Sequence, residues 1–317
     1  MGYLVLWIAL GIVAFAAAVF AAFTAVSYFM VFYSPKKGQN DDANLPKEID
    51  YTRYGTSAYD MVRAASSEPY EELFITSRDG LKLRGRLYKR HGDDAPVAVG
   101  FHGYRGTPSR DFSGGLFSFL NMGCNVILAE QRGCGLSEGH TITFGIKERF
   151  DCVDWVKYAA ELFPGSKIAL FGISMGASTV LMASGDPELP ENVKLICADC
   201  PFNRPGDIIK SVTRSMKLPA ELVYIPIYAG ARIFGRFDPS ETSAEENVKK
   251  AKVPVVVIHG LADTFVPCEM SECLAEANPL CRRYTFPDAQ HGVSFLEDRE
   301  RYERIIADAA RECGITG

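Results

Sequence analysis

The chain has 317 residues, which is room for one large α/β domain and a short additional segment. Its formal net charge is -5 and it contains no long basic run, so nucleic acid is not an expected partner. The nine cysteines are odd in number and dispersed, which indicates a reducing compartment. Cys197 and Cys200 form a C-x-x-C, but no second pair lies at zinc spacing, so we interpret both as core thiols and expect no metal.

The N-terminal segment is long and uncharged. Tyr3 to Tyr33 contains no charged side chain, and about 20 apolar residues are enough to cross a bilayer as a helix. The segment exceeds the roughly 7–15 residues of a signal-peptide core and lacks the basic leader, so residues 1–34 are predicted to be a retained transmembrane anchor. Lys36 and Lys37 follow it, which places the body of the protein in the cytoplasm by the positive-inside rule. A buried core helix is the alternative.

The segment after the anchor has the composition of a linker over residues 35–45, and the main domain is expected over 46–317. A helix on the flank of this domain is predicted within 46–69. Two alternating segments, 72–76 and 81–88, predict an antiparallel hairpin at the edge of a sheet.

Short apolar strands then alternate with helical patterns. The predicted strands are 96–101, 125–129, 167–171, 193–198, 253–258 and 283–286, and the predicted helices are 112–122, 147–162, 175–184, 269–277 and 299–313. This alternation is typical of an α/β fold with a mainly parallel sheet and helices on both faces.

One connection, residues 199–252, is far longer than the usual loop between a strand and the next helix. Helices are predicted over 207–216 and 220–237, which makes the segment of about 202–250 a cap above the C-terminal edge of the sheet. The second helix is unusually apolar. Its side chains form either an apolar roof over a ligand pocket, which could also touch lipid, or the core of the cap itself.

The turn Phe171-Gly-Ile-Ser-Met-Gly-Ala177 joins a predicted strand to a predicted helix. Gly-x-Ser-x-Gly in this context is the pattern of a nucleophile elbow, in which the glycines let strand and helix approach and hold the serine at an exposed apex. Ser174 is therefore the predicted nucleophile. The amide of Met175 opens the helix and is a predicted oxyanion donor. A glycine-rich turn that only packs is the alternative.

A serine hydroxyl needs a base to take its proton and a carboxylate to orient that base. Asp263 and His291 both lie downstream of Ser174, and each follows a predicted strand. The C-terminal ends of parallel strands meet at the edge where ligands bind in open α/β sheets. We therefore predict Asp263 as the acid and His291 as the base.

Competing residues remain. Asp199 also ends a predicted strand and is the alternative acid. His102 and His259 are expected to shape their loops through structural hydrogen bonds. A second oxyanion donor is expected in the loop after the third strand, where the Tyr104 amide is the candidate. Arg105 beside it either binds a substrate carboxylate or is solvated.

These motifs occur in series: His102-Gly-Tyr104, Gln131-Arg-Gly-Cys-Gly-Leu-Ser137, Gly172-Ile-Ser-Met-Gly176, Gly260-Leu-Ala-Asp263 and Gln290-His-Gly292. In this order, over about residues 72–313, the chain resembles the serine hydrolases of the α/β-hydrolase fold. It most resembles bacterial capped hydrolases of the serine aminopeptidase and monoacylglycerol lipase branch. The resemblance implies Ser174 as nucleophile, Asp263 as acid, His291 as base, and the amides of Tyr104 and Met175 as oxyanion hole. Glu130 stands where the family usually has Asp, which bears on the packing of its loop.

The combined expectation is a membrane-anchored serine hydrolase that needs no cofactor and cleaves a carboxylic ester through an acyl-enzyme on Ser174. Thioester and small-amide hydrolysis are alternatives, as is a non-catalytic binding protein on the same fold. The expected partners are a small acyl substrate and the membrane. The sequence indicates no oligomeric state.

Overall fold

The computed structural model describes residues 2–35, 54 and 57–316. The predicted linker 35–45 therefore lies, apart from Pro35, outside the described residues. So does the predicted start of the main domain at Pro46.

The body is built on a sheet of eight strands in the order β1-β2-β4-β3-β5-β6-β7-β8. The strands are β1 Glu71–Thr76, β2 Lys82–Tyr88, β3 Val97–Phe101, β4 Asn125–Ala129, β5 Ile168–Ile173, β6 Val193–Asp199, β7 Val255–Gly260 and β8 Cys281–Phe286. The pairs β1/β2 and β2/β4 are antiparallel, and all other neighbours are parallel. The predicted edge hairpin and mainly parallel sheet are both confirmed.

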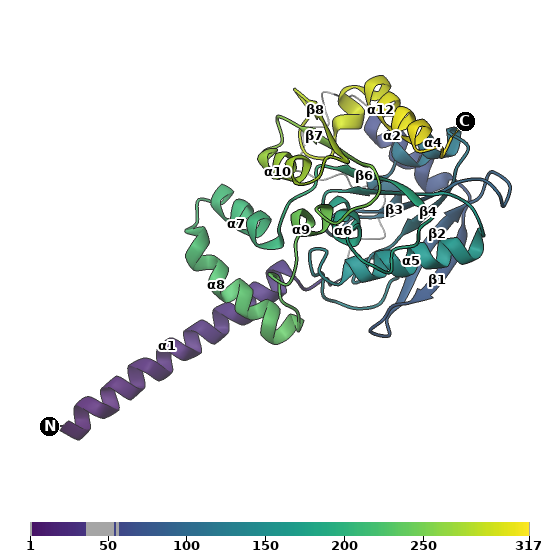
Figure 1. Ribbon diagram of the computed structural model, residues 1–317. Helices are drawn as coiled ribbons and strands as arrows, with labels where there is room; N and C mark the ends of the chain where they lie inside the picture. The colour runs from purple at the N-terminus through teal and green to yellow at the C-terminus, as the bar shows by residue number, and fades with distance from the viewer. Residues whose placement is uncertain (1, 36–53, 55–56, 317) are drawn as a thin grey trace.

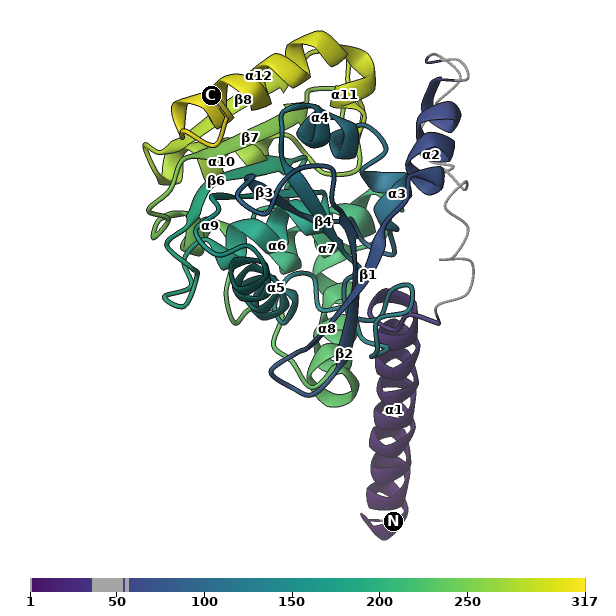
Figure 2. The same ribbon diagram turned by 90° about the vertical axis from the view of Figure 1, so that its right-hand side faces the viewer.

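Helices cover both faces of the sheet (Figure 1; Figure 2). In chain order the shorter helices of the body are α2 Ser57–Ser67, α3 Pro108–Asp111, α4 Gly115–Asn121, α6 Met175–Ala183, α9 Ala244–Val248, α10 Glu269–Ala277 and α11 Ser294–Glu297, and the longer ones are α5 Glu148–Leu162 and α12 Arg299–Glu312. Helices α5 and α6 pack on one face, whereas α4 and α12 pack on the other. Because both faces are covered, β3 and β4 are buried at every position, which is why they read as continuous apolar runs.

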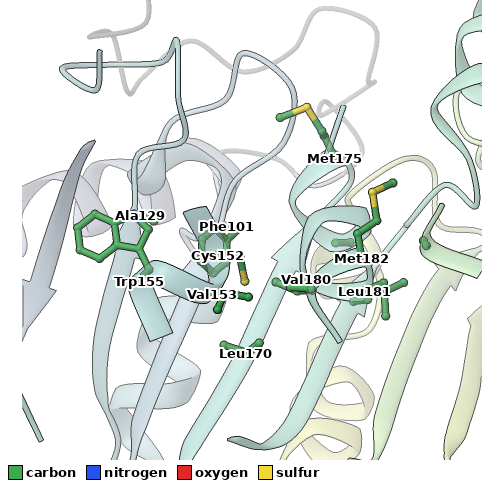
Figure 3. Packing of buried hydrophobic residues seen from close by; sticks show 14 of the residues in the cluster. Phe101, Ala129, Cys152, Val153, Trp155, Leu170, Met175, Val180, Leu181 and Met182 are labelled. Atoms are coloured by element: carbon green, nitrogen blue, oxygen red, sulfur yellow. The ribbon is translucent and has the colours of Figure 1, made fainter. Parts of the chain in front are cut away.

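The core on the α5 and α6 side contains the largest buried side chain, Trp155 (Figure 3). Its ring lies so close to β2 that a Cβ at Gly85 would come within 2.6 Å of it. Glycine at this strand position therefore makes room for the tryptophan, a packing reason for a residue that otherwise weakens strands. Met175 and Met182, at the two ends of α6, complete the same layer (Figure 3).

Helix α1, Gly2–Val31, projects from the body (Figure 1; Figure 2). It is the only helix among the described residues that is long and apolar enough to cross a membrane, and its most apolar window is not buried. The alternative of a buried core helix is therefore wrong. Beyond its last turn the chain enters the body, where the buried ring of Phe32 packs edge-on against Phe144 and Phe237. The Phe32 carbonyl also accepts a hydrogen bond from the Ile142 amide at 2.8 Å.

The insertion between β6 and β7 holds α7 Pro205–Ser215, α8 Ala220–Gly230, the π-helical segment η2 Ala231–Gly235, and α9. The two predicted helices are present, although the second changes to π-helical geometry at Ala231. Helix α8 packs on α1 and crosses it (Figure 1). The insertion thus contacts the N-terminal helix as well as the body.

Candidate active site

The turn between β5 and α6 brings one serine to the edge of the sheet. Ser174 has φ 56° and ψ -115°, a conformation that costs a non-glycine residue about 1–3 kcal/mol. The glycines on either side have no room for a side chain: a Cβ at Gly172 would lie 2.3 Å from the Gly176 carbonyl oxygen, and one at Gly176 would lie 1.8 Å from that of Phe101. Strand and helix therefore approach as closely as the Gly-x-Ser-x-Gly pattern predicts.

Three side chains from three loops meet beside this turn. The Ser174 hydroxyl donates to Nε2 of His291 at 2.9 Å, and Nδ1–H of His291 donates to Oδ2 of Asp263 at 2.7 Å. The serine, the histidine and the aspartate follow β5, β8 and β7, parallel strands of one sheet whose C-terminal ends share one edge; β6 lies between β5 and β7. The side chain of Asp263 is fully buried, whereas that of His291 is 16% exposed. The arrangement can move a proton from the hydroxyl to the imidazole and hold the resulting cation against the carboxylate.

The carboxyl of Asp263 is held in its ionised form. Burial alone would raise its pKa, but hydrogen bonds from His259 and His291 outweigh burial and place the pKa well below its usual range. The backbone amides of Phe265 and Val266 donate to the second oxygen at 2.9 and 2.8 Å. These four donors fix the carboxylate toward His291. The hydrogen bond from His259 shows the loop-shaping role expected of that histidine.

Asp199, the alternative acid, lies on the other side of the site. Its side chain follows Leu195 and Cys197 along β6, so it faces the α12 side of the sheet, where the Tyr302 hydroxyl donates to it. Burial raises the pKa of its carboxyl to about 6, and Oδ1 has no hydrogen-bond partner. The structure therefore brings Asp263, and not Asp199, into contact with the imidazole.

The two predicted oxyanion donors flank the serine. A Cβ added to Gly103 would lie 3.4 Å from the Cβ of Ser174, so the loop after β3 passes close to the Ser174 side chain. Among the described residues, no protein acceptor takes up the backbone N–H of Tyr104 or of Met175. The carboxylate of Asp111 accepts from the Gly103 amide at 2.7 Å and fixes this loop. The sequence analysis did not identify Asp111, because its position after a Pro-Ser-Arg segment does not indicate that it accepts a hydrogen bond from the loop after β3.

The same loop is tied to the end of α1. The Tyr104 hydroxyl donates to the Val31 carbonyl at 2.7 Å, and Nη2 of Arg105 donates to the carbonyls of Tyr33 at 2.6 Å and Met30 at 3.2 Å. Arg105 is half-buried, and its guanidinium is engaged by carbonyls at the end of α1, a role that neither expectation described. A guanidinium satisfies carbonyls that a helix leaves unpaired at its C-terminus.

His102 and Glu130 stabilise the loops behind the site. Nδ1–H of His102 donates to the Gly103 carbonyl at 2.8 Å, and Nε2 accepts from the Gln131 amide at 3.0 Å, so the ring is neutral and burial lowers its pKa. Glu130, the departure from the family pattern, accepts from Arg84 at 2.7 Å and from the Leu136 amide at 2.9 Å. Its longer side chain fits because Gly135 leaves the space free: a Cβ there would lie 2.5 Å from the carboxylate.

A cavity of about 640 Å³ opens beside Ser174. It extends between the sheet and the helices α4, α11 and α12, and its apolar wall is largely aromatic: Phe112, Phe119, Phe171 and Phe295. Of the insertion between β6 and β7, only Ser215 lines it. The expectation that the apolar cap helix forms the roof of the pocket is therefore wrong. The pocket is formed by the layer between sheet and helices instead.

The sulfur of Cys200 is the remaining reactive atom near the site. It lies 4.0 Å from Nε2 of His291, and together with Asp263 the two could present three ligands to a metal ion. Burial raises the pKa of the thiol well above its usual value, and both ring nitrogens of His291 already have hydrogen-bond partners. A metal needs a thiolate and a free ring nitrogen, so the donor set fits a hydrogen-bonded triad better than a metal site.

Comparisons with known proteins agree with this geometry. Residues 99–222 match the family described as alpha/beta hydrolase fold. The chain is 24% identical to the uncharacterized protein YqkD of Bacillus subtilis, over 95% of this chain and 96% of that protein. It is 25% identical to the bifunctional esterase/perhydrolase DCH of Acinetobacter calcoaceticus, over 74% and 98% of the two chains. The structure of the Pyrococcus furiosus esterase Pf2001 superposes with a TM-score of 0.62 at 25% identity, covering 79% of this chain and 94% of the esterase.

Proposed function

We propose that this chain, which has the α/β-hydrolase fold, is a serine hydrolase that cleaves carboxylic esters of small acyl substrates. The observation that carries the proposal is the continuous hydrogen-bond chain from the Ser174 hydroxyl through His291 to Asp263. Esterases among its relatives and structural neighbours support the same reaction class.

In the proposed reaction, Nε2 of His291 takes the proton of Ser174 while Oγ attacks the ester carbonyl. The carbonyl oxygen becomes an oxyanion and accepts hydrogen bonds from the backbone N–H groups of Tyr104 and Met175. The imidazolium, held by Asp263, then protonates the departing alcohol, which leaves an acyl group on Oγ. Water, deprotonated by His291, releases the acid and restores the hydroxyl.

The lining of the cavity favours an uncharged acyl substrate over a charged one. The wall carries four phenylalanine rings, and two of its charged side chains, Arg110 and Asp111, are paired with each other at 2.7 Å. A thioester is the second candidate because the same acyl-enzyme serves both leaving groups, and a relative of this chain, aneE of Aspergillus aculeatus, is named a thiohydrolase. A thiol leaves more readily than an alkoxide, so a thioester would demand less of His291 as an acid.

We also propose that α1 is a retained membrane anchor with the catalytic body on the cytoplasmic side. Cleavage of the segment as a signal sequence would either remove Phe32 from the core of the body or leave it at a free N-terminus. It would also remove the carbonyls to which Tyr104 and Arg105 donate. The lysines that follow the helix supply the orientation. A topology reporter fused to the C-terminus checks this: cytoplasmic signal is expected, and a signal from the opposite side would contradict the orientation.

Labelling with a fluorophosphonate tests the enzyme assignment. We expect the wild type to react and Ser174→Ala to lose the label completely, because only a deprotonated serine beside an oxyanion hole attacks such a probe. Ser113→Ala, at another serine of the cavity wall, is the matched control and should label as the wild type does. An unreactive wild type would favour the binding-protein alternative.

A further inference from the structure

The insertion between β6 and β7 carries an exposed apolar surface that the proposed chemistry does not use. Its members are 44–67% exposed. They are Met216, Leu218, Leu222, Ile225, Ile233 and Phe234, which we call the insertion surface. Soluble proteins rarely leave apolar residues grouped in this way unless a partner covers them.

The surface follows from the helical spacing of α8 and η2. Leu222, Ile225 and Ile233 are three and eight residues apart, so they share one side of the helix, while Ile227 and Gly230 on the other side are buried. No charged residue occurs between Glu221 and Arg232. Between these two charged residues, the helix has one side packed on protein and an exposed side that is apolar.

The position of α8 on α1 indicates what covers that side. Gly230 packs directly on Thr24, where a Cβ would come within 2.8 Å of the Thr24 carbonyl oxygen. Thr24 lies 22 positions after Gly2 along α1, which is about 33 Å at 1.5 Å per residue and close to the roughly 30 Å thickness of a bilayer's hydrocarbon core. If the N-terminus of α1 lies at the far surface, Thr24 lies at the near one. Helix α8, which crosses α1 at this level, then lies along the membrane surface (Figure 1).

Basic side chains border the insertion surface. Lys217 and Arg236 are exposed immediately before α8 and after η2, and Arg232 lies between them. The acidic side chains beside this surface are already paired: Asp238 with Arg232, and Glu221 with Lys210 and Arg214 at 2.6 and 3.0 Å. An apolar helix with Lys and Arg at its borders matches the boundary between acyl chains and anionic headgroups.

We propose that α8 and η2 form an interfacial helix that docks on the anionic bilayer crossed by α1. This rests on the proposed membrane insertion of α1, but not on the proposed catalytic residues. With α1 inserted and α8 docked, the body is attached to the membrane at two places, which sets its orientation relative to the bilayer. Ser215 lines the cavity and Met216 beside it belongs to the insertion surface, so the cavity mouth adjoins the membrane surface. Esters dissolved in the bilayer therefore have a short path to Ser174.

Tryptophan quenching by brominated lipid in reconstituted full-length protein tests the docking. The chain has 2 Trp, and Trp7 in α1 is replaced by Phe while the core residue Trp155 stays. In this background we expect Ile225→Trp, in vesicles of phosphatidylcholine and phosphatidylglycerol with brominated acyl chains, to lose fluorescence and shift its emission to the blue. The matched control is Leu280→Trp, at a side chain that is 40% exposed just before the edge strand β8, and it should not be quenched.

The outcomes separate the two parts of the inference. Quenching of native Trp7 in the wild type reports insertion of α1. If Trp7 is quenched but Ile225→Trp, like Leu280→Trp, is not, the docking of α8 is wrong and the membrane insertion of α1 stands. The same result is expected if a second copy of the chain covers the insertion surface. An unquenched Trp7 overturns both. Equal quenching of Ile225→Trp in pure phosphatidylcholine overturns the contribution assigned to the basic side chains. Fluorophosphonate labelling is independent of all these results.

Discussion

Two carboxylates lie at the same sheet edge, and their different surroundings decide which can serve the imidazole. Asp263 accepts from two histidines and two amides, which holds it ionised, whereas Asp199 is buried with one oxygen unpaired and its pKa raised to about 6. The sequence could place both residues at strand ends. It could not show which of the two carboxylates contacts the imidazole, because the side of the sheet on which each side chain lies depends on the helices packed there.

The proposed roles of Asp263 and Asp199 predict very different losses of kcat when each is replaced by Asn. Asp263→Asn should lower kcat about 10³–10⁴-fold, since the imidazole loses both the group that orients it and the charge that stabilises its cation. Asp199→Asn should change kcat by less than about threefold, because the hydrogen-bond partners of the imidazole are Asp263 and Ser174, and Asp199 is not among them. Steady-state hydrolysis of a p-nitrophenyl ester measures both. A larger loss in Asp199→Asn than in Asp263→Asn would reverse the assignment.

Asp199 should also affect how stability changes with pH. Its pKa is about 6 in the folded protein and about 3.9 in an unfolded chain, so between pH 4 and 6 the folded state keeps a proton that the unfolded state releases. The stability contribution of Asp199 is therefore present at low pH and lost as pH rises through 6, at a cost of up to about 3 kcal/mol. Asn cannot ionise, so Asp199→Asn should melt about 2–6 °C above the wild type at pH 8 and near it at pH 4. Calorimetry in detergent at both pH values checks this, and an equal shift at both would contradict the burial of an ionised carboxyl.

At the scale of elements, the C-terminus of α1 and the loop after β3 form one unit. Tyr104 and Arg105 donate to three carbonyls at the end of α1, and Phe32 just beyond it is a core residue. Composition identified α1 as an apolar span but not this contact, because an uncharged helix end carries no sign of which loop will satisfy its carbonyls.

Arg105 is accordingly expected to act as a positioning residue. Arg105→Ala should lower kcat about tenfold with little change in KM, since the loop that carries the Tyr104 amide loses its attachment while the cavity is untouched. Arg105→Lys should recover part of the loss, because an ammonium can still donate to a helix C-terminus. Steady-state kinetics of the two variants separate this from simple unfolding, which would lower the active fraction of both alike. An unchanged kcat in Arg105→Ala would show that the loop keeps its shape without the helix.

The prediction of elements from the sequence was most successful where burial is uniform. Parallel strands covered on both faces appear as apolar runs, so the eight strands and the loops at their ends could be read directly. The insertion was harder. Its helices were predicted, but the direction of α8 was not, since an apolar side predicts contact with something apolar and does not distinguish a pocket, a core or a bilayer.

At the scale of the whole molecule, the protein combines an α/β-hydrolase body with an apolar helix whose C-terminal end contacts a loop of the candidate active site. The cavity lies within the layer between the sheet and α4, α11 and α12, while the insertion extends toward α1 (Figure 2). On the proposed account the anchor, the docking helix and the cavity mouth share one side of the molecule. Substrates that partition into membranes are the class this arrangement would favour.

The proposed mechanism requires that Ser174 carries an acyl group during turnover. The wild type is incubated with an activated ester, quenched in acid, digested with trypsin, and the peptide spanning residues 168–194 is sequenced by mass spectrometry. An acyl adduct on Ser174, absent from Asp263→Asn at the same reaction time, is the result the account predicts. An adduct on Ser178 or Ser184 in this peptide, an adduct on Cys200 in the next tryptic peptide (residues 195–210), or turnover of the ester with no adduct in either peptide would contradict it.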